Sequence, residues 1–196
     1  MRFRVDSLTA FAASALSACE VPGADAALTA RSLVQADQRG IHSHGLLRLP
    51  LYVSALTAGG IAAQPQVSFV RDNGASAVLN GGSGLGQVVM QTAVDWTLER
   101  APDHGVSCVA VENSSHYGAG AFWTDQLAAR GIFSLLTSTT GPTAAVHGGS
   151  AKVIGTNPLT LAAPTAAELH AIPHRYVAYC PALLPSREHA PALLPS

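Results

Sequence analysis

The stretch VSCVAVENSSHYGAGAFWTDQLAARGIFSLLTS, residues 106–138, decides the fold class of this chain. Its first seven and last seven residues are short apolar runs, which is the pattern of buried strands. Between these runs, residues 119–131 have helical character and end at a glycine, a frequent helix stop. A strand, a helix and a second strand in succession predict an α/β layer with at least some parallel pairing.

The residues before this stretch extend the same pattern. The β-branched runs QVSFV (66–70) and SAVLN (76–80) are separated by the turn RDNGA, so they predict a hairpin. Residues 86–101, GQVVMQTAVDWTLERA, have the spacing of an amphipathic helix. Farther along, LTLAA (159–163) predicts a short strand. We therefore expect a mixed α/β sheet domain over residues 63–166.

Residues 1–62 predict a helical segment instead. Ser7 is placed to cap a helix that runs to about residue 19, and a second helix ends near Gly40. A third run at helical spacing covers residues 46–56, with Pro50 in its first turn or at a kink. By contrast, a tail over residues 167–196 repeats PALLPS and has no helix or strand signal, so we expect it to be foreign to the fold.

Composition excludes several classes of protein. Hydrophobic residues make up 48% of the chain and charged residues 12%, which is enough apolar material for a real core. The net charge is -1 and no basic run exists, so we expect no nucleic-acid face. The three cysteines are far apart and fit neither zinc nor disulfide spacing, which favours a reducing cytoplasm. No apolar stretch is long enough to cross a membrane.

The first 19 residues, MRFRVDSLTAFAASALSAC, allow two interpretations. Two arginines, an apolar run and a final LSAC resemble a lipoprotein signal. Alternatively, this is an amphipathic helix with Leu8, Phe11, Ala15 and Cys19 on one face. Asp6 interrupts the core of an export signal, so we favour the helix.

The segment NGGSGLGQ, residues 80–87, follows a predicted strand and precedes a predicted helix, as a dinucleotide-binding turn does. Its glycine spacing is G-x-G-x-G rather than G-x-G-x-x-G, and no acidic residue ends a strand about 20 positions later. A tight strand-to-helix turn explains the glycines better. A phosphate at the helix start remains the alternative.

The segment DQRGIHSHGLLRLPLY, residues 37–52, places a polar cluster between two apolar runs. His42 and His44 could share a metal, but no carboxylate or cysteine has a complementary spacing. Acid–base chemistry fits better, because histidine titrates near neutral pH. Arg48 follows His44 by four residues, so on a helix start both would face one pocket, where a guanidinium suits a carboxylate. The structural alternative is a capping histidine and an arginine that extends into solvent.

A second polar site is predicted at SSHYGAGAFW, residues 114–123. His116 follows a strand and precedes glycines and a helix start, which is where open α/β sheets place ligands. Small residues there let a cofactor approach the backbone. A plain strand-to-helix loop is the alternative, but a second histidine–glycine site favours function.

Together, ADQRGIHSHGLLRLPLY, GGSGLGQ, SSHYGAGAFW and GGSAKVIGTNPLTLAAPT resemble the successive signatures of the type-2 malate/L-lactate dehydrogenase family. The resemblance runs from about residue 3 to 167, with the motifs in order. It implies a family-specific α/β fold that binds NAD or NADP and is not a Rossmann domain. Family members run to nearly twice this length, so the resemblance also implies an incomplete, truncated fold.

The family's functional residues can be carried over by position. His44 resembles the acid–base histidine, Ser43 and Arg48 match its neighbours in the substrate pocket, and His116 matches a second histidine. The remaining implied residues lie on the cofactor side: His116, Tyr117, Gly118, Gly120, Thr140, Thr156, Asn157 and Pro158.

The resemblance implies an NAD(P)-dependent oxidoreductase that interconverts a small 2-hydroxy acid and its 2-oxoacid. Arg48 would hold the carboxylate, and His44 or His116 would exchange the proton. Family members act as dimers, so a homodimer is the expected assembly. The alternatives are an inactive remnant of the family and, more weakly, a histidine-based metal hydrolase.

Overall fold

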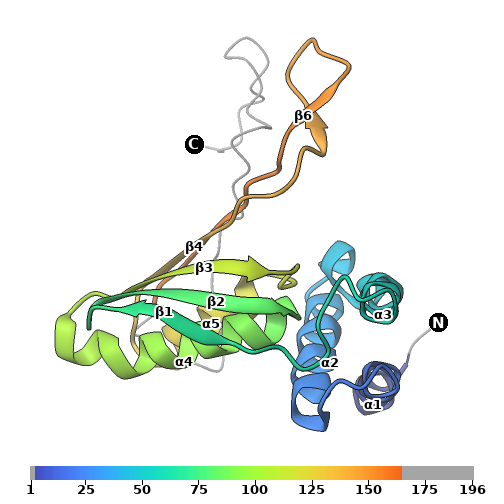
Figure 1. Cartoon of the computed structure of the whole chain (residues 1–196), viewed down its shortest axis with the longest axis horizontal. Helices are drawn as coiled ribbons and strands as arrows, with labels where there is room; N and C mark the ends of the chain where they lie inside the picture. The colour runs from blue at the N-terminus through green and yellow to red at the C-terminus, as the bar shows by residue number, and fades with distance from the viewer. Residues whose placement is uncertain (1–2, 165–196) are drawn as a thin grey trace, which may run out of the picture.

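The computed structural model describes residues 3–164, so the predicted tail and the end of the predicted sheet domain lie outside the described residues. Three helices form the first part: α1 (Val5–Ser17), α2 (Gly23–Gln38) and α3 (Leu49–Thr57). They surround one apolar core and stand beside the sheet (Figure 1). Pro50 lies in the first turn of α3, as predicted, where its missing N–H has no intrahelical partner to lose.

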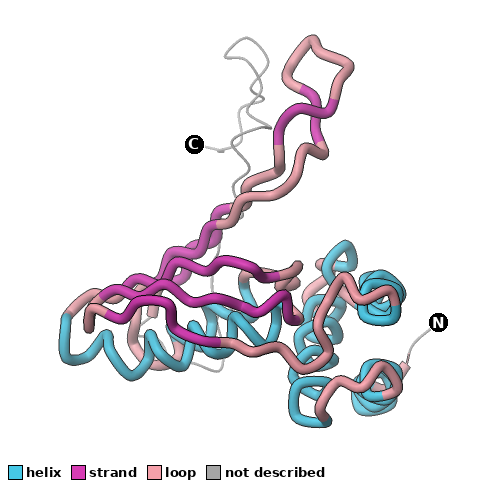
Figure 2. Tube along the Cα trace, viewed as in Figure 1, coloured by secondary structure: helices cyan, strands magenta, loops and turns pink. Residues whose placement is uncertain are grey.

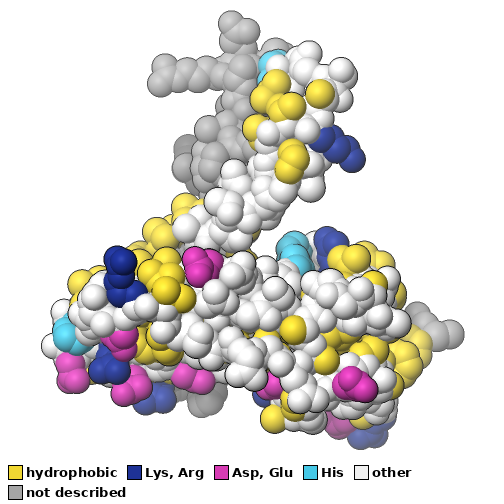
Figure 3. All heavy atoms as spheres, viewed as in Figure 1, with side chains coloured by type: hydrophobic (Ala, Val, Ile, Leu, Met, Phe, Trp, Pro, Cys, Tyr) yellow, Lys and Arg dark blue, Asp and Glu magenta, His cyan; other side chains and the backbone are white. Residues whose placement is uncertain are grey.

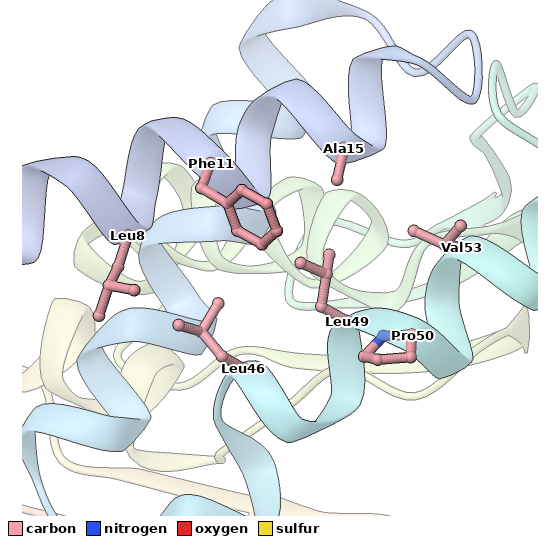
Figure 4. Close-up of a pocket in the computed structure, with 7 residues that line it drawn as sticks. All are labelled: Leu8, Phe11, Ala15, Leu46, Leu49, Pro50 and Val53. Atoms are coloured by element: carbon pink, nitrogen blue, oxygen red, sulfur yellow. The ribbon is translucent and has the colours of Figure 1, made fainter. Parts of the chain in front are cut away.

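Helix α1 is present as expected, and Ala15 and Cys19 of the expected apolar face pack against the core, but its most buried residues lie beside that face. Ala12 and Leu16 are fully buried, whereas Phe11 is 64% exposed. Leu8, Phe11 and Ala15 instead line an apolar groove of about 320 Å³ between α1 and α3 (Figure 4). Ser7 does not cap the helix, which starts two residues earlier without a side-chain cap.

The central sheet has three strands: β1 (Ser68–Asp72), β2 (Ser76–Gly84) and β3 (Cys108–Ser114). Strands β1 and β2 form the predicted antiparallel hairpin. Strands β2 and β3 are parallel, and the helix α4 (Gly86–His104) connects them. A parallel pair requires such a crossover, so the strand–helix–strand pattern correctly predicted this pairing.

Helix α4 covers only one face of this sheet (Figure 1). Val109 and Val111 of β3 pack with Leu79 of β2 and Val89 of α4. The alternate residues of β3 are exposed, so the expectation of a strand buried on both faces was wrong. On the uncovered side Val70 is 62% exposed, and hydrophobic side chains reach the surface there (Figure 3).

The last part of the described chain is a helix followed by strand pairs. Helix α5 (Ala121–Ala128) packs beside α4, and β4 (Ser134–Thr137) pairs with β7 (Leu159–Ala162) in antiparallel register. Between them, β5 (Ala144–Ala145) and β6 (Lys152–Ile154) form a hairpin that projects from the body (Figure 2). No helix of the described chain is both long and apolar enough to span a bilayer.

The helical segment and the sheet segment are in contact. Helix α2 packs against α4 and α5, and Leu28 of α2 joins a core with Met90, Trp123 and Leu127. The loop that carries His116 lies at this junction, because His116 contacts Tyr52 of α3 and Ser115 accepts a hydrogen bond from Gly86 at the start of α4. The division at residue 62 stays a prediction.

Candidate active site

The turn that carries His44 and Arg48 is irregular. It consists of two short 3₁₀ helices, η1 (His42–His44) and η2 (Leu46–Arg48), separated by Gly45 in an extended conformation. His44 and Arg48 therefore do not share one helix start, the arrangement under which both were expected to face one pocket. Arg48 still turns back toward η1, because its Nε donates a hydrogen bond of 2.6 Å to the carbonyl oxygen of Ser43.

Asp37, at the end of α2, holds this turn in place. Its Oδ2 accepts a hydrogen bond from the backbone N–H of Leu46 at 2.8 Å, and its Oδ1 accepts one from Nδ1 of His42 at 2.8 Å. Its carboxylate fills the space beside Gly45, where a Cβ would lie 2.5 Å from Oδ2. His42 is thus engaged with Asp37, whereas Nδ1 of His44 contacts the Ser43 hydroxyl at 2.9 Å.

The structure brings the two predicted catalytic histidines together. The rings of His44 and His116 stack with their centroids 5.4 Å apart and an interplanar angle of 28°. Ser43 and Arg48 border the pair from η1 and η2. Four candidate residues from two distant motifs thus form one cluster.

Nδ1 of His116 is hydrogen-bonded by groups that the sequence did not indicate. The Tyr52 hydroxyl lies 2.6 Å from Nδ1 of His116, and Nε2 of Gln87 donates to that hydroxyl at 2.9 Å. The N–H of Gly118 also donates to Nδ1, at 3.3 Å. Because Nδ1 accepts this bond, it carries no proton, so Tyr52 is the donor and Nε2 of His116 bears the N–H.

The environment keeps both histidines uncharged near neutral pH. Burial lowers the pKa of His116 to about 4, and the charges of His44 and Arg48 act in the same direction. Burial, followed by the charge of Arg48, also lowers the pKa of His44. Burial raises the pKa of Tyr52 to about 12, so its hydroxyl stays protonated and remains a donor.

Arg48 is the one cation beside the histidine pair in the part of the chain that the structure describes. Within residues 3–164, no carboxylate lies within 4.0 Å of its guanidinium. Its Nε is engaged with Ser43, which fixes the plane of the group. A half-buried guanidinium without an acidic partner is a suitable site for the carboxylate of a ligand.

The predicted cofactor residues form two groups. Tyr117 and Gly118 lie in the His116 loop, and Tyr117 is hydrogen-bonded to the Ser138 side chain after β4. Burial raises the pKa of Tyr117, with that bond opposing it. Gly120 packs against Thr160, with the position of a Cβ 3.1 Å from the Thr160 Cβ. The space beside Gly120 is therefore filled by this chain.

Thr140, Thr156 and Asn157 form the second group, at the base of the projecting hairpin. Thr140 N–H donates to Oδ1 of Asn157 at 3.1 Å, and Thr156 N–H donates to Oγ1 of Thr140 at 2.8 Å. All three residues are exposed, and Asn157 has a positive φ of 40°. Pro158 accepts a hydrogen bond of 3.3 Å from the N–H of Ser138, which ties this group to the end of β4.

The glycine-rich turn at 80–87 serves packing. A Cβ at Gly86 would meet the backbone of Ser115 and His116, and the Gly86 N–H donates to the Ser115 hydroxyl at 2.9 Å. That hydroxyl donates to the carbonyl oxygen of Gly84 at 2.9 Å. The turn thus holds the His116 loop, which agrees with the tight-turn interpretation.

The described residues also bear on a metal site. Within residues 3–164, no group of three histidine, cysteine or acidic side chains is placed to hold a metal ion. His42 and His44 contact different partners, Asp37 and Ser43. The geometry therefore gives the metal hydrolase alternative no support.

Asp37, Tyr52 and Gln87 are functional neighbours that sequence reasoning missed. Asp37 and Tyr52 stand at the two ends of the quoted motif 37–52, so their place in that motif was an available signal. Gln87 follows the glycine turn directly. For Gln87, nothing in the sequence indicated a contact with Tyr52, 35 residues away.

The described chain thus combines a mixed α/β fold with two stacked histidines and a guanidinium that has no acidic partner among the described residues. The family model described as malate/L-lactate dehydrogenase matches residues 3–172. The chain therefore belongs to the malate/L-lactate dehydrogenase family, as its motifs predicted. Its similar proteins include malate, L-sulfolactate and ureidoglycolate dehydrogenases.

Individual relatives agree with this assignment. The chain is 38% identical over 165 residues to a malate dehydrogenase of Pyrococcus abyssi, covering 84% of this chain and 46% of that protein. It is 33% identical over 139 residues to the ureidoglycolate dehydrogenase (NAD(+)) of Escherichia coli strain K12, covering 71% and 40%. The chain thus spans less than half the length of these curated relatives.

The solved structures show the same fold. The malate dehydrogenase of Pyrococcus horikoshii OT3 superposes with a TM-score of 0.85 at 33% identity, covering 92% of this chain and 50% of that one. The sulfolactate dehydrogenase of Methanocaldococcus jannaschii gives 0.84 at 30% identity, covering 92% and 51%. The mixed α/β fold is therefore confirmed, and it corresponds to about half of these structures.

Proposed function

We propose that this chain carries the acid–base site of an NAD(P)-dependent oxidoreductase that interconverts a small 2-hydroxy acid and its 2-oxoacid. The observation that carries the proposal is the guanidinium of Arg48 beside two stacked, uncharged histidines. A cation and a proton carrier side by side match the carboxylate and the adjacent C2 oxygen of such substrates. Family membership supports the same chemistry.

Arg48 and the two histidines have different roles in the proposed reaction. Arg48 binds the substrate carboxylate and orients C2 toward the histidine pair. His44 takes the hydroxyl proton during oxidation and returns it during reduction, for which an uncharged imidazole is the competent base. His116, whose Nε2 already bears a proton, donates a hydrogen bond to the C2 oxygen. When bound, the nicotinamide accepts a hydride from C2 or delivers one to it. The substrate carboxylate also offsets the charge of Arg48, which favours protonation of the histidines in the complex.

The nucleotide side of the site rests on the group of Thr140, Thr156 and Asn157. Their exposed hydroxyl and amide groups fit hydrogen bonding to a ribose or an amide. Tyr117 and Pro158 connect this group to the His116 loop through Ser138. We propose NAD or NADP as the cofactor, and titration decides between them.

A fluorescence titration of the purified chain with NADH and, separately, with NADPH tests the cofactor proposal. Turnover with a panel of small 2-oxoacids then tests the reaction, with His44→Gln and His116→Gln as variants. We expect saturable binding and turnover that falls by roughly a hundredfold or more in one of the two variants. Unchanged turnover in both folded variants would refute the acid–base assignment.

The alternative is a family member without turnover. A folded chain that binds neither nucleotide would establish this alternative. We also propose a homodimer, and sedimentation velocity measured in the same buffer tests that assembly.

A further inference from the structure

Gln87 is a fully buried polar residue that the proposed reaction does not use directly. It lies in the first turn of α4 with 0% of its surface exposed, and its Nε2 donates to the Tyr52 hydroxyl at 2.9 Å. Tyr52 is 1% exposed, and its hydroxyl reaches Nδ1 of His116 at 2.6 Å. The amide, the phenol and the imidazole thus form one directed line of hydrogen bonds.

We propose that Gln87 is a positioning residue that aims the donor hydroxyl of Tyr52 at Nδ1 of His116. Its catalytic meaning rests on the proposed function, because with Nδ1 bonded to Tyr52 only the Nε2 edge of His116 is left for a substrate. The hydroxyl has a second acceptor, the carbonyl oxygen of His116 at 3.4 Å. With its amide donor in place, Gln87 aims the hydroxyl at the nearer acceptor, the ring nitrogen.

The unpaired oxygen of Gln87 argues against a role in packing alone. Among the described residues, Oε1 of Gln87 has no hydrogen-bond partner, although the atom is buried. A buried amide oxygen without a partner destabilises a fold, and a methionine of similar shape would avoid this cost. The bond to Tyr52 is the benefit that an amide offers here and a methionine does not.

Two Gln87 variants test the proposal. Gln87→Met removes the donor and keeps the shape, and Gln87→Asn keeps an amide but withdraws it by one methylene. Tyr52→Phe breaks the same line at its next bond. Gln91→Met is the matched control, because Gln91 lies one turn along the same helix and bonds only to Asp95 and Gln126 among the partners that the structure shows.

The measurement is an NMR titration of the His116 imidazole in the full chain, assigned with His116→Gln. A donor at Nδ1 stabilises the neutral ring, so its loss raises the pKa of His116. We expect a rise of half a unit or more, about threefold in proton affinity, in both Gln87 variants and in Tyr52→Phe. The Gln91→Met variant should titrate as the wild type does.

An unchanged His116 titration in a folded Gln87 variant would overturn the proposal, whichever of the two variants folds. This readout needs neither cofactor nor turnover. If the chain turns over no 2-oxoacid, the proposed function fails while the titration still decides the role of Gln87. If turnover is present, the pH profile of kcat should shift with Gln87→Met and stay in place with Gln91→Met.

Discussion

Substituting Gly45 by alanine tests what holds the turn that carries His44 and Arg48 in its conformation. The backbone at Gly45 is extended, with φ −88° and ψ −153°, and its negative φ does not by itself require glycine. The obstacle is Asp37, since the new Cβ would lie 2.5 Å from Oδ2 and nearer still to the rest of the carboxylate. The carboxylate must therefore move away, and the Leu46 N–H loses its acceptor.

The size of the effect follows from the bonds that Asp37 gives up. A hydrogen bond from a part-buried N–H to a carboxylate contributes about 2 kcal/mol to the free energy of unfolding. The pair with His42 adds little, because the His42 side chain is 75% exposed. We expect Gly45→Ala to lower the Tm by roughly 4–8 °C.

Urea unfolding of Gly45→Ala, Asp37→Ala and the double variant measures the coupling. Each single variant should lose about 2 kcal/mol, and the double variant should lose no more than Asp37→Ala alone, because the obstacle is already gone. Costs that simply add would refute the explanation. Gly23→Ala is the control, because no atom lies within 4 Å of the added Cβ, and it should stay within about 1 kcal/mol of the wild type.

Four further predictions concern charge and site geometry. The hydrogen bond from Gly74 N–H, followed by that from Trp96, lowers the pKa of Asp72, so the wild type loses stability as the pH falls through that lowered pKa. In thermal melts, the Tm of Asp72→Asn should fall less than that of the wild type as the pH is lowered. The pKa of His116 falls from 6.5 to about 4 on folding, so stability should rise with pH between these values. The slope of Tm against pH should be smaller in His116→Gln, and an equal slope would contradict this cause. Gly155→Ala places a Cβ 2.5 Å from the Thr140 hydroxyl oxygen and should weaken nucleotide binding by roughly tenfold in the fluorescence titration, without changing the His116 NMR signal. Arg48→Lys loses the planar, two-pronged donor and should raise the KM for 2-oxoacids by roughly tenfold in steady-state assays, with little change in nucleotide binding.

Local patterns predicted the elements of this fold well. The hairpin at 66–80 and the amphipathic helix that starts at residue 86 appear where the periodicity placed them. That helix runs three residues farther than expected and includes Pro102, which lies near its C-terminal end, before Gly105 stops it in the left-handed conformation. Element type depends on residues that are close in sequence, which is why periodicity identifies it.

What depended on packing between distant residues was not predictable. The helical spacing placed Phe11 on an apolar face, but it could not show that Ala12 and Leu16 would be fully buried while Phe11 stays exposed. The sequence likewise identified His44 and His116 as candidates in two separate motifs, but it did not show that their rings would be in contact. Their support by Tyr52 and Gln87 spans 64 and 35 residues, a distance over which no local pattern carries information.

The uncovered face of the β1–β2–β3 sheet affects how readily the purified chain adsorbs other molecules in solution. Val70 is 62% exposed there, and Leu135, on the side of β4 opposite the Leu136 core contact, is 58% exposed. Among the described residues β3 pairs only with β2, so its outer edge offers unpaired backbone groups. Such a surface adsorbs hydrophobic dyes and other chains. Sulfate or phosphate at high concentration strengthens this adhesion, so dilute protein in a low-salt buffer suits every titration described above.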